Sequence, residues 1–261
     1  MHVFGPGARF PYDPERGPPP VDAPKELLFA LHRKLGIQRC VVVQSLAHGM
    51  DHSAVEDIIA AGQGRYLGVA ILSPDVTDPE LQRLASAGFR GVRFRFLDRE
   101  VDRSEVDAML DFTRRLQALD MHLQVHLHAM HVHQLAPALV RSPVPVVIDH
   151  IGRVDASLGL EHPDFLGIHA LLRHPHCHIK VSGVDRITRA GRYAEGVPFA
   201  AKLVRDYPLQ CVWGTDWPHP HHDHVPDDGV LVDLLAQIAP DAASLHRLLV
   251  DNPLRLYRFE A

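Results

Sequence analysis

Short apolar runs recur along this chain, and segments with helical spacing separate most of them. Runs of this kind, rich in β-branched residues, are typical of parallel strands that are buried on both faces. The segment 106–116 places its apolar residues three and four positions apart, so one face of a helix would pack against a sheet. The expected strands centre on residues 2–4, 40–44, 68–70, 91–94, 123–126, 146–149, 178–181 and 211–214.

The alternation of strand and helix limits the fold more than any other feature of the sequence. Strands that are joined through helices pair in parallel and are connected by right-handed crossovers. Eight such units in 261 residues predict an α/β fold of the (β/α)8 TIM-barrel type, with residues 1–261 in a single domain. An open doubly wound sheet is the main alternative, but the sequence contains no GxGxxG turn and no P-loop motif.

Charge and cysteine content argue against several classes of protein. Lysine and arginine total 27 against 32 aspartate and glutamate residues, with no basic run, which argues against nucleic acid as a partner. No apolar stretch is long enough to cross a membrane, and the first residues do not resemble a secretory signal, so we expect a cytoplasmic protein. Cys40, Cys177 and Cys211 form no CxxC pair, which indicates neither a disulfide framework nor a thiolate zinc site.

Polar side chains gather where the expected strands end. In residues 92–96 and 122–128 the polar positions alternate with apolar ones, so they share one face of each strand. Outer helices would cover the apolar face, and the polar face would then point into the barrel near its C-terminal mouth, where the active sites of this fold lie. Buried charges are costly unless they are paired or used. We therefore expect Arg93, His126, His150 and Asp216 to converge on one cavity.

Several motifs carry a resemblance to a known family. Residues 213–220 (WGTDWPHP) are similar to the eighth-strand motif of the amidohydrolase superfamily. Residues 149–153 (DHIGR) and 251–257 (DNPLRLY) resemble, within that superfamily, the lactonases of 2-pyrone-4,6-dicarboxylate. The similarity extends along essentially the whole chain. Related groups of the superfamily hydrolyse sugar lactones and sulfomuconolactone, so the motifs define the superfamily more firmly than the substrate.

The resemblance implies hydrolysis of a small anionic lactone without an obligatory metal ion. Asp216 would act as the general base on water, and His150, with His2, would bind the lactone carbonyl and the developing oxyanion. Arginine suits the substrate carboxylates, because its planar guanidinium binds a carboxylate through two hydrogen bonds. The resemblance assigns the substrate to Arg93, Arg99, Arg186, His126, Ser45 and His48.

The sequence departs from the family pattern at two places. The family begins its first strand with His-x-His, whereas this sequence contains only the second histidine, His2. Either the start codon was assigned too late or the protein works with one histidine, and we expect a first strand that is shortened at its N-terminus. His126 stands where the pyrone-dicarboxylate lactonases have tyrosine and where metal-dependent members have a histidine ligand. Two alternatives follow. His2, His126 and Asp216 could hold zinc or another divalent ion in a metal-dependent hydrolase or decarboxylase, or the barrel could bind carboxylates without catalysis.

Overall fold

The computed structural model describes residues 1–97, 100–220 and 224–259. Its parallel strands form one sheet in which each strand pairs with the next along the chain. The predicted α/β barrel class is confirmed, but the described sheet has seven strands and forms an open barrel. The strands are β1 (Cys40–Val43), β2 (Tyr66–Ala70), β3 (Phe89–Phe96), β4 (His122–Leu127), β5 (Val146–Ile148), β6 (Cys177–Lys180) and β7 (Cys211–Val212).

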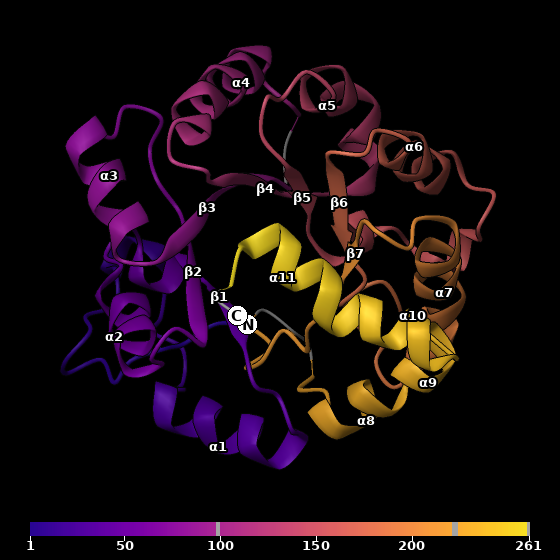
Figure 1. The fold of residues 1–261 in the computed structure, drawn as a ribbon, viewed down its shortest axis with the longest axis horizontal. Coiled ribbons are helices and arrows are strands. Elements are labelled where there is room, and N and C mark those ends of the chain that lie inside the picture. Colours follow the sequence, from indigo (N-terminus) through magenta and orange to yellow (C-terminus); the bar gives the residue numbers. More distant parts are fainter. Residues whose placement is uncertain (98–99, 221–223, 260–261) are drawn as a thin grey trace.

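Helices alternate with these strands and lie around the outside of the curled sheet (Figure 1). They are α1 (Lys25–Leu35), α2 (Ser53–Ala61), α3 (Asp78–Ser86), α4 (Arg103–Gln117), α5 (Val132–Leu139), α6 (Pro163–Leu172) and α7 (Val197–Asp206). After β7 the chain forms α8 (Asp228–Asp233), α9 (Leu235–Ile238), α10 (Ala242–His246), a π-helical turn (Arg247–Asp251) and α11 (Asn252–Tyr257). Within the described ranges, no helix has both the length and the apolar character needed to cross a membrane.

The final helix closes one end of the open barrel. Tyr257 of α11 is buried, and it packs with Leu67 of β2 and Val212 of β7. Helix α11 crosses the centre of the view in Figure 1, over the strands. The cavity that carries the polar side chains extends from the carboxyl ends of the strands to this helix.

The strand expected at residues 2–4 is not a strand in the structure, which corrects the eight-strand prediction. Phe4 forms only an isolated antiparallel bridge with Ala23. The backbone N–H of Val43 donates to the carbonyl of Met1 at 2.8 Å, and the N–H of His2 donates to the carbonyl of Trp217, also at 2.8 Å. The first two residues thus link β1 to the segment after β7, and these two bonds hold His2 at the mouth of the barrel.

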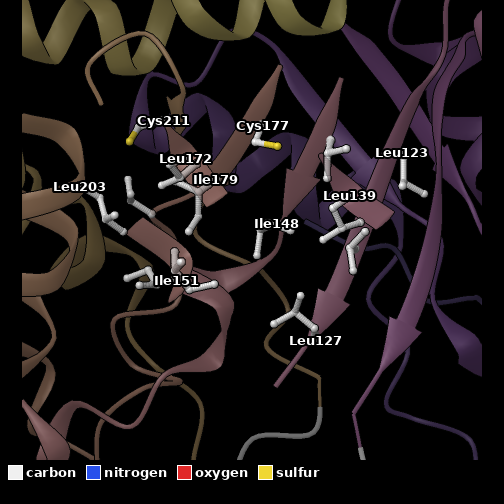
Figure 2. Packing of buried hydrophobic residues seen from close by; sticks show 14 of the residues in the cluster. Leu123, Leu127, Leu139, Ile148, Ile151, Leu172, Cys177, Ile179, Leu203 and Cys211 are labelled. Carbon is white, nitrogen blue, oxygen red and sulfur yellow. The ribbon is translucent and has the colours of Figure 1, made fainter. Parts of the chain in front are cut away.

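The apolar core lies between the sheet and the helices. Alternating residues of the strands supply one side of this layer, and apolar positions of the outer helices supply the other. Polar residues such as Gln124, which alternate with the apolar positions of β4, consequently take the inner face. Figure 2 shows part of the layer, including Leu123, Leu127, Leu139, Ile148, Leu172, Ile179 and Leu203.

Candidate active site

Asp216 is the centre of a buried cluster at the carboxyl ends of the strands. It follows β7, and only 5% of the residue is exposed. Its backbone has φ 69, and that of His150, which follows β5, has φ 48. Non-glycine residues rarely adopt this left-handed conformation, and such strain concentrates at functional sites. The turns that end β5 and β7 therefore present both side chains to one point inside the barrel.

The Asp216 carboxylate contacts three basic side chains. Nε2 of His2 lies 3.4 Å from Oδ1, and Nε2 of His150 lies 3.8 Å from Oδ2. Arg186, in the loop after β6, donates from Nε to Oδ2 at 2.6 Å, and its second nitrogen also contacts this oxygen. The same guanidinium donates to the carbonyl of Pro220 at 3.0 Å. Arg186 is thus the partner with the shortest contact to Asp216 in the structure.

These contacts determine the ionisation of Asp216. Burial alone would raise the pKa of its carboxyl group, but the neighbouring His150 and the guanidinium of Arg186 outweigh burial. Together they hold the pKa of Asp216 well below its ordinary value. The carboxylate is therefore ionised at neutral pH, which is the state that a general base requires.

The two imidazoles beside Asp216 are fixed by hydrogen bonds on their other ring nitrogens. Nδ1 of His2 lies 2.8 Å from the carbonyl of Val43, and Oγ of Ser182 lies 3.3 Å from Nδ1 of His150. Burial lowers the pKa of each histidine to about 4. Both rings are therefore neutral at pH 7, with Nε2 of each directed toward Asp216.

A second charged group lies beside the first and contains Arg93. The guanidinium of Arg93 donates to the carbonyl of Gln44 at 2.9 Å and lies 3.8 Å from Oδ2 of Asp149. Lys180 Nζ lies 2.8 Å from the other oxygen of Asp149. The amide of Gln124 donates to Oδ2 at 3.0 Å. Nε of Arg93 has no hydrogen-bond partner among the described residues, so this buried donor is available to a ligand.

A cavity of about 460 Å³ lies against both groups. It extends from Asp216 into the gap between β1 and β7, as far as residues of α11. Its walls in the gap are mainly apolar, with Gln38 and Arg39 as polar exceptions. The polar lining includes His2, Arg93, Asp149, His150, Lys180, Ser182 and Asp216.

His126 lies beside His150, but it is not among the residues that line this cavity. The ring centroids of the two histidines are 5.4 Å apart. Burial lowers the pKa of His126 well below its ordinary value, and neither of its ring nitrogens has a hydrogen-bond partner among the described residues. The neutral ring can therefore either donate to a ligand or accept from one.

The ligand set His2, His126 and Asp216, which the sequence suggested for a divalent ion, is not assembled in this geometry. Across the described ranges, no three side chains of histidine, cysteine, aspartate or glutamate are grouped so that they could hold a metal ion. The guanidinium of Arg186 also donates a hydrogen bond to the Asp216 carboxylate, the group that would have to bind the cation. These residues do not fit a three-ligand metal centre, and we derive no catalytic step through one.

Ser45 and His48 follow β1 and stabilise the loops at the mouth. Ser45 Oγ accepts a hydrogen bond from the N–H of Ala47, where it caps a short 3-10 helix. His48 Nδ1 lies 2.9 Å from the carbonyl of Pro11, and its Nε2 accepts from the N–H of Gly5. Both side chains are buried by these contacts. Arg99, the remaining expected substrate contact, lies outside the described residues.

Lys180 and Ser182 belong to the site although the sequence did not single them out, and Gln124 was indicated only as one of the alternating polar positions of residues 122–128. Lys180 and Ser182 are two positions apart at the end of β6, so both side chains lie on the face that points into the barrel interior. The same alternation that indicated Arg93 could have identified them. Lysine is also common on solvent-exposed edge strands, so the position of Lys180 in the sequence was only weak evidence for a buried site.

Ionisable side chains gathered at the carboxyl ends of parallel barrel strands define a class, the TIM-barrel enzymes. A family model described as Amidohydrolase matches residues 1–259. The chain belongs to this family, and it is a hydrolase of that type. The resemblance drawn from the sequence motifs is therefore confirmed.

Individual relatives show which members of the family this chain is similar to. The chain is 41% identical to a 2-pyrone-4,6-dicarbaxylate hydrolase of Comamonas testosteroni, over 98% of this chain and 88% of that protein. It is 40% identical to a 4-sulfomuconolactone hydrolase of Hydrogenophaga intermedia, over 98% of this chain and 86% of that protein. It also resembles the crystal structure of a "probable 2-pyrone-4,6-dicarboxylic acid hydrolase" from Acinetobacter baumannii with citric acid bound. That similarity has a TM-score of 0.87 at 25% identity and covers 99% of this chain and 97% of the other.

Proposed function

We propose that this protein hydrolyses a small anionic lactone, such as 2-pyrone-4,6-dicarboxylate, and that Asp216 is the general base. The observation that carries the proposal is the buried, ionised Asp216 carboxylate, which lies between two neutral imidazoles in a cavity lined by arginine and lysine. The names of the relatives support the substrate class, since the two relatives that are 41% and 40% identical to this chain are named as hydrolases of anionic lactones.

His2 and Asp216 are arranged to activate water. The carbonyl of Val43 can only accept, so Nδ1 of His2 carries the ring proton and Nε2 has a free lone pair. That lone pair faces Oδ1 of Asp216 at 3.4 Å. Two acceptors this close together can both accept from one water molecule. As the water oxygen bonds to the lactone carbonyl carbon, Asp216 takes the proton that the water loses.

His150 is placed to stabilise the oxyanion. When the hydroxyl of Ser182 donates to Nδ1, the proton of the neutral imidazole is on Nε2, the nitrogen that faces the Asp216 region. This N–H can donate to the carbonyl oxygen and bind it more strongly as negative charge develops. When the ring C–O bond breaks, the leaving oxygen receives the proton held by Asp216. The ring-opened carboxylic acid then releases its remaining proton to solvent, and Asp216 is ionised again.

The arginines provide the sites for the substrate carboxylates. The buried Nε of Arg93 has no hydrogen-bond partner among the described residues, whereas Arg186 is bound to Asp216. A substrate carboxylate competes with Asp216 for the Arg186 guanidinium, because both anions satisfy the same donors. When Arg186 moves to the substrate, Asp216 loses its closest cation and its pKa rises toward the value of an effective base. Substrate binding thereby activates the base.

The proposal is tested by a substrate panel with Arg93→Met. Purified protein is assayed on 2-pyrone-4,6-dicarboxylate, 4-sulfomuconolactone and a neutral lactone such as δ-valerolactone. The wild type should prefer the anionic lactones, and Arg93→Met should raise KM for them about 10- to 100-fold, the usual effect of losing a charge-assisted hydrogen bond. Arg103→Met on the exposed face of α4 is the control. Wild-type protein without activity on any lactone would refute the proposed function.

A further inference from the structure

Lys180 and Arg93 share a single buried carboxylate. Asp149 is 1% exposed, and its two oxygens face two cations, Lys180 at 2.8 Å and Arg93 at 3.8 Å. The Lys180 side chain is only 15% exposed although it ends its strand. A carboxylate carries one negative charge, so this group of three side chains has one positive charge in excess.

The unequal distances show which cation retains that charge. Lys180 makes a direct ion pair with Asp149, whereas the 3.8 Å contact of Arg93 is longer than a hydrogen bond. Arg93 is held instead by the carbonyl of Gln44, and its Nε has no hydrogen-bond partner among the described residues. Lys180 therefore neutralises Asp149, and the charge of Arg93 remains available.

We infer that Lys180 is a positioning residue that sets the specificity of the site for anions, because it prevents Asp149 from capturing Arg93. This inference rests on the proposed role of Arg93 in binding a substrate carboxylate. Without Lys180, Asp149 would be a buried carboxylate without its ion pair, a state that is strongly unfavourable. The nearest remaining cation is Arg93, which needs to move only from 3.8 Å into hydrogen-bond distance. Anion binding would then have to break that new ion pair.

The charges predict an unusual pattern among variants. Lys180→Met should weaken anion binding about 10- to 100-fold, the effect of losing one charge-assisted hydrogen bond to the ligand. Asp149→Asn should not weaken it, since Arg93 then has no competing carboxylate. The double variant Asp149→Asn/Lys180→Met restores the excess charge and should recover most of the lost affinity. Lys180→Arg keeps the ion pair and should bind like the wild type.

Citrate binding measured by calorimetry at pH 7 tests this pattern without turnover. Citrate is the probe because it is the anion bound in the structurally similar Acinetobacter baumannii protein. Lys202→Met on the outer helix α7 removes a lysine that pairs with Asp206 and is the matched control. Thermal unfolding of each variant identifies those that fail to fold. If Lys180→Met does not fold, the double variant still tests the inference, because it lacks the Asp149 carboxylate that would otherwise be unpaired.

Kinetics supply a second measurement that a purely structural role would not reproduce. Lys180→Met should raise KM for an anionic lactone, leave kcat nearly unchanged and leave the neutral lactone unaffected. Loss of citrate affinity that the double variant does not recover would overturn the inference, as would wild-type protein that does not bind citrate. Inactivity of the wild type on every lactone would refute the proposed function instead, and the citrate pattern would still decide the role of Lys180.

Discussion

Replacing Arg186 with methionine tests how Asp216 is controlled. The guanidinium donates to Asp216 at 2.6 Å, so the two charge centres are about 4 Å apart. At an effective dielectric constant of about 20, such charges interact by about 4 kcal/mol. Loss of an interaction of this size lets the pKa of Asp216 rise from its depressed value. Without Arg186, the effect of burial also acts to raise the pKa of Asp216.

The sign of the pH effect follows from the role of a general base. The rate falls as pH drops through the pKa of the base, so a higher pKa moves the acid limb of kcat/KM upward. In the wild type, the histidines with pKa values of about 4 should determine this limb, because Asp216 remains ionised at that pH. For Arg186→Met we expect the limb to lie at least one pH unit higher.

The assay measures kcat/KM for 2-pyrone-4,6-dicarboxylate from about pH 3 to about pH 9, so that it includes the wild-type limb. Arg186→Lys retains a cation and should keep the wild-type limb, and Arg189→Met changes an exposed arginine in the same loop. KM for the anionic lactone should also rise about 10- to 100-fold in Arg186→Met. An acid limb that stays in place would refute the proposed coupling between Arg186 and the ionisation of Asp216.

Two further predictions concern His126 and the buried histidines. His126→Tyr should retain substantial activity, and wild-type activity should survive prolonged chelation; loss in both tests, with zinc restoring the chelated protein, would favour the metal-dependent alternative. The second prediction is that the free energy of unfolding, measured with denaturant, decreases as pH falls from 6.5 toward 4. Burial depresses the folded-state pKa of several histidines below the unfolded value of 6.5, so the unfolded state binds more protons in this range, and each such group contributes about 1.4 kcal/mol per pH unit. A flat profile would contradict the burial of these groups, which are His2, His32, His122, His150 and His178.

Most of the sheet could be predicted because its strands are buried on both faces. Apolar runs such as residues 146–148 have few alternatives once helical segments flank them. The region of residues 2–4 was assigned wrongly as a strand. Its conformation depends on hydrogen bonds from Val43 and to Trp217, which are distant in sequence. The local sequence pattern of residues 2–4 contains no information about hydrogen-bond partners that are so distant in the chain.

The site could be predicted only in part for a similar reason. Alternation and strand ends identified Arg93, His150 and Asp216, because strand geometry fixes the direction of each side chain. The ion pair of Arg186 with Asp216 joins a loop to a strand end, and loop conformation does not follow from the spacing of residues. The pairing of Lys180 with Asp149 likewise depends on the register of β5 and β6, which the sequence does not specify.

The central claim is that Asp216 removes the proton from the attacking water, and kcat of Asp216→Asn tests it most directly. The amide keeps the shape of the side chain but cannot take up the proton at this step. We expect kcat for 2-pyrone-4,6-dicarboxylate to fall by about 10²- to 10⁴-fold, the usual contribution of a positioned acid–base group. Asp206→Asn, at the end of α7, is the control and should keep wild-type kcat. A fully folded Asp216→Asn protein with kcat within about threefold of the wild type would contradict the account.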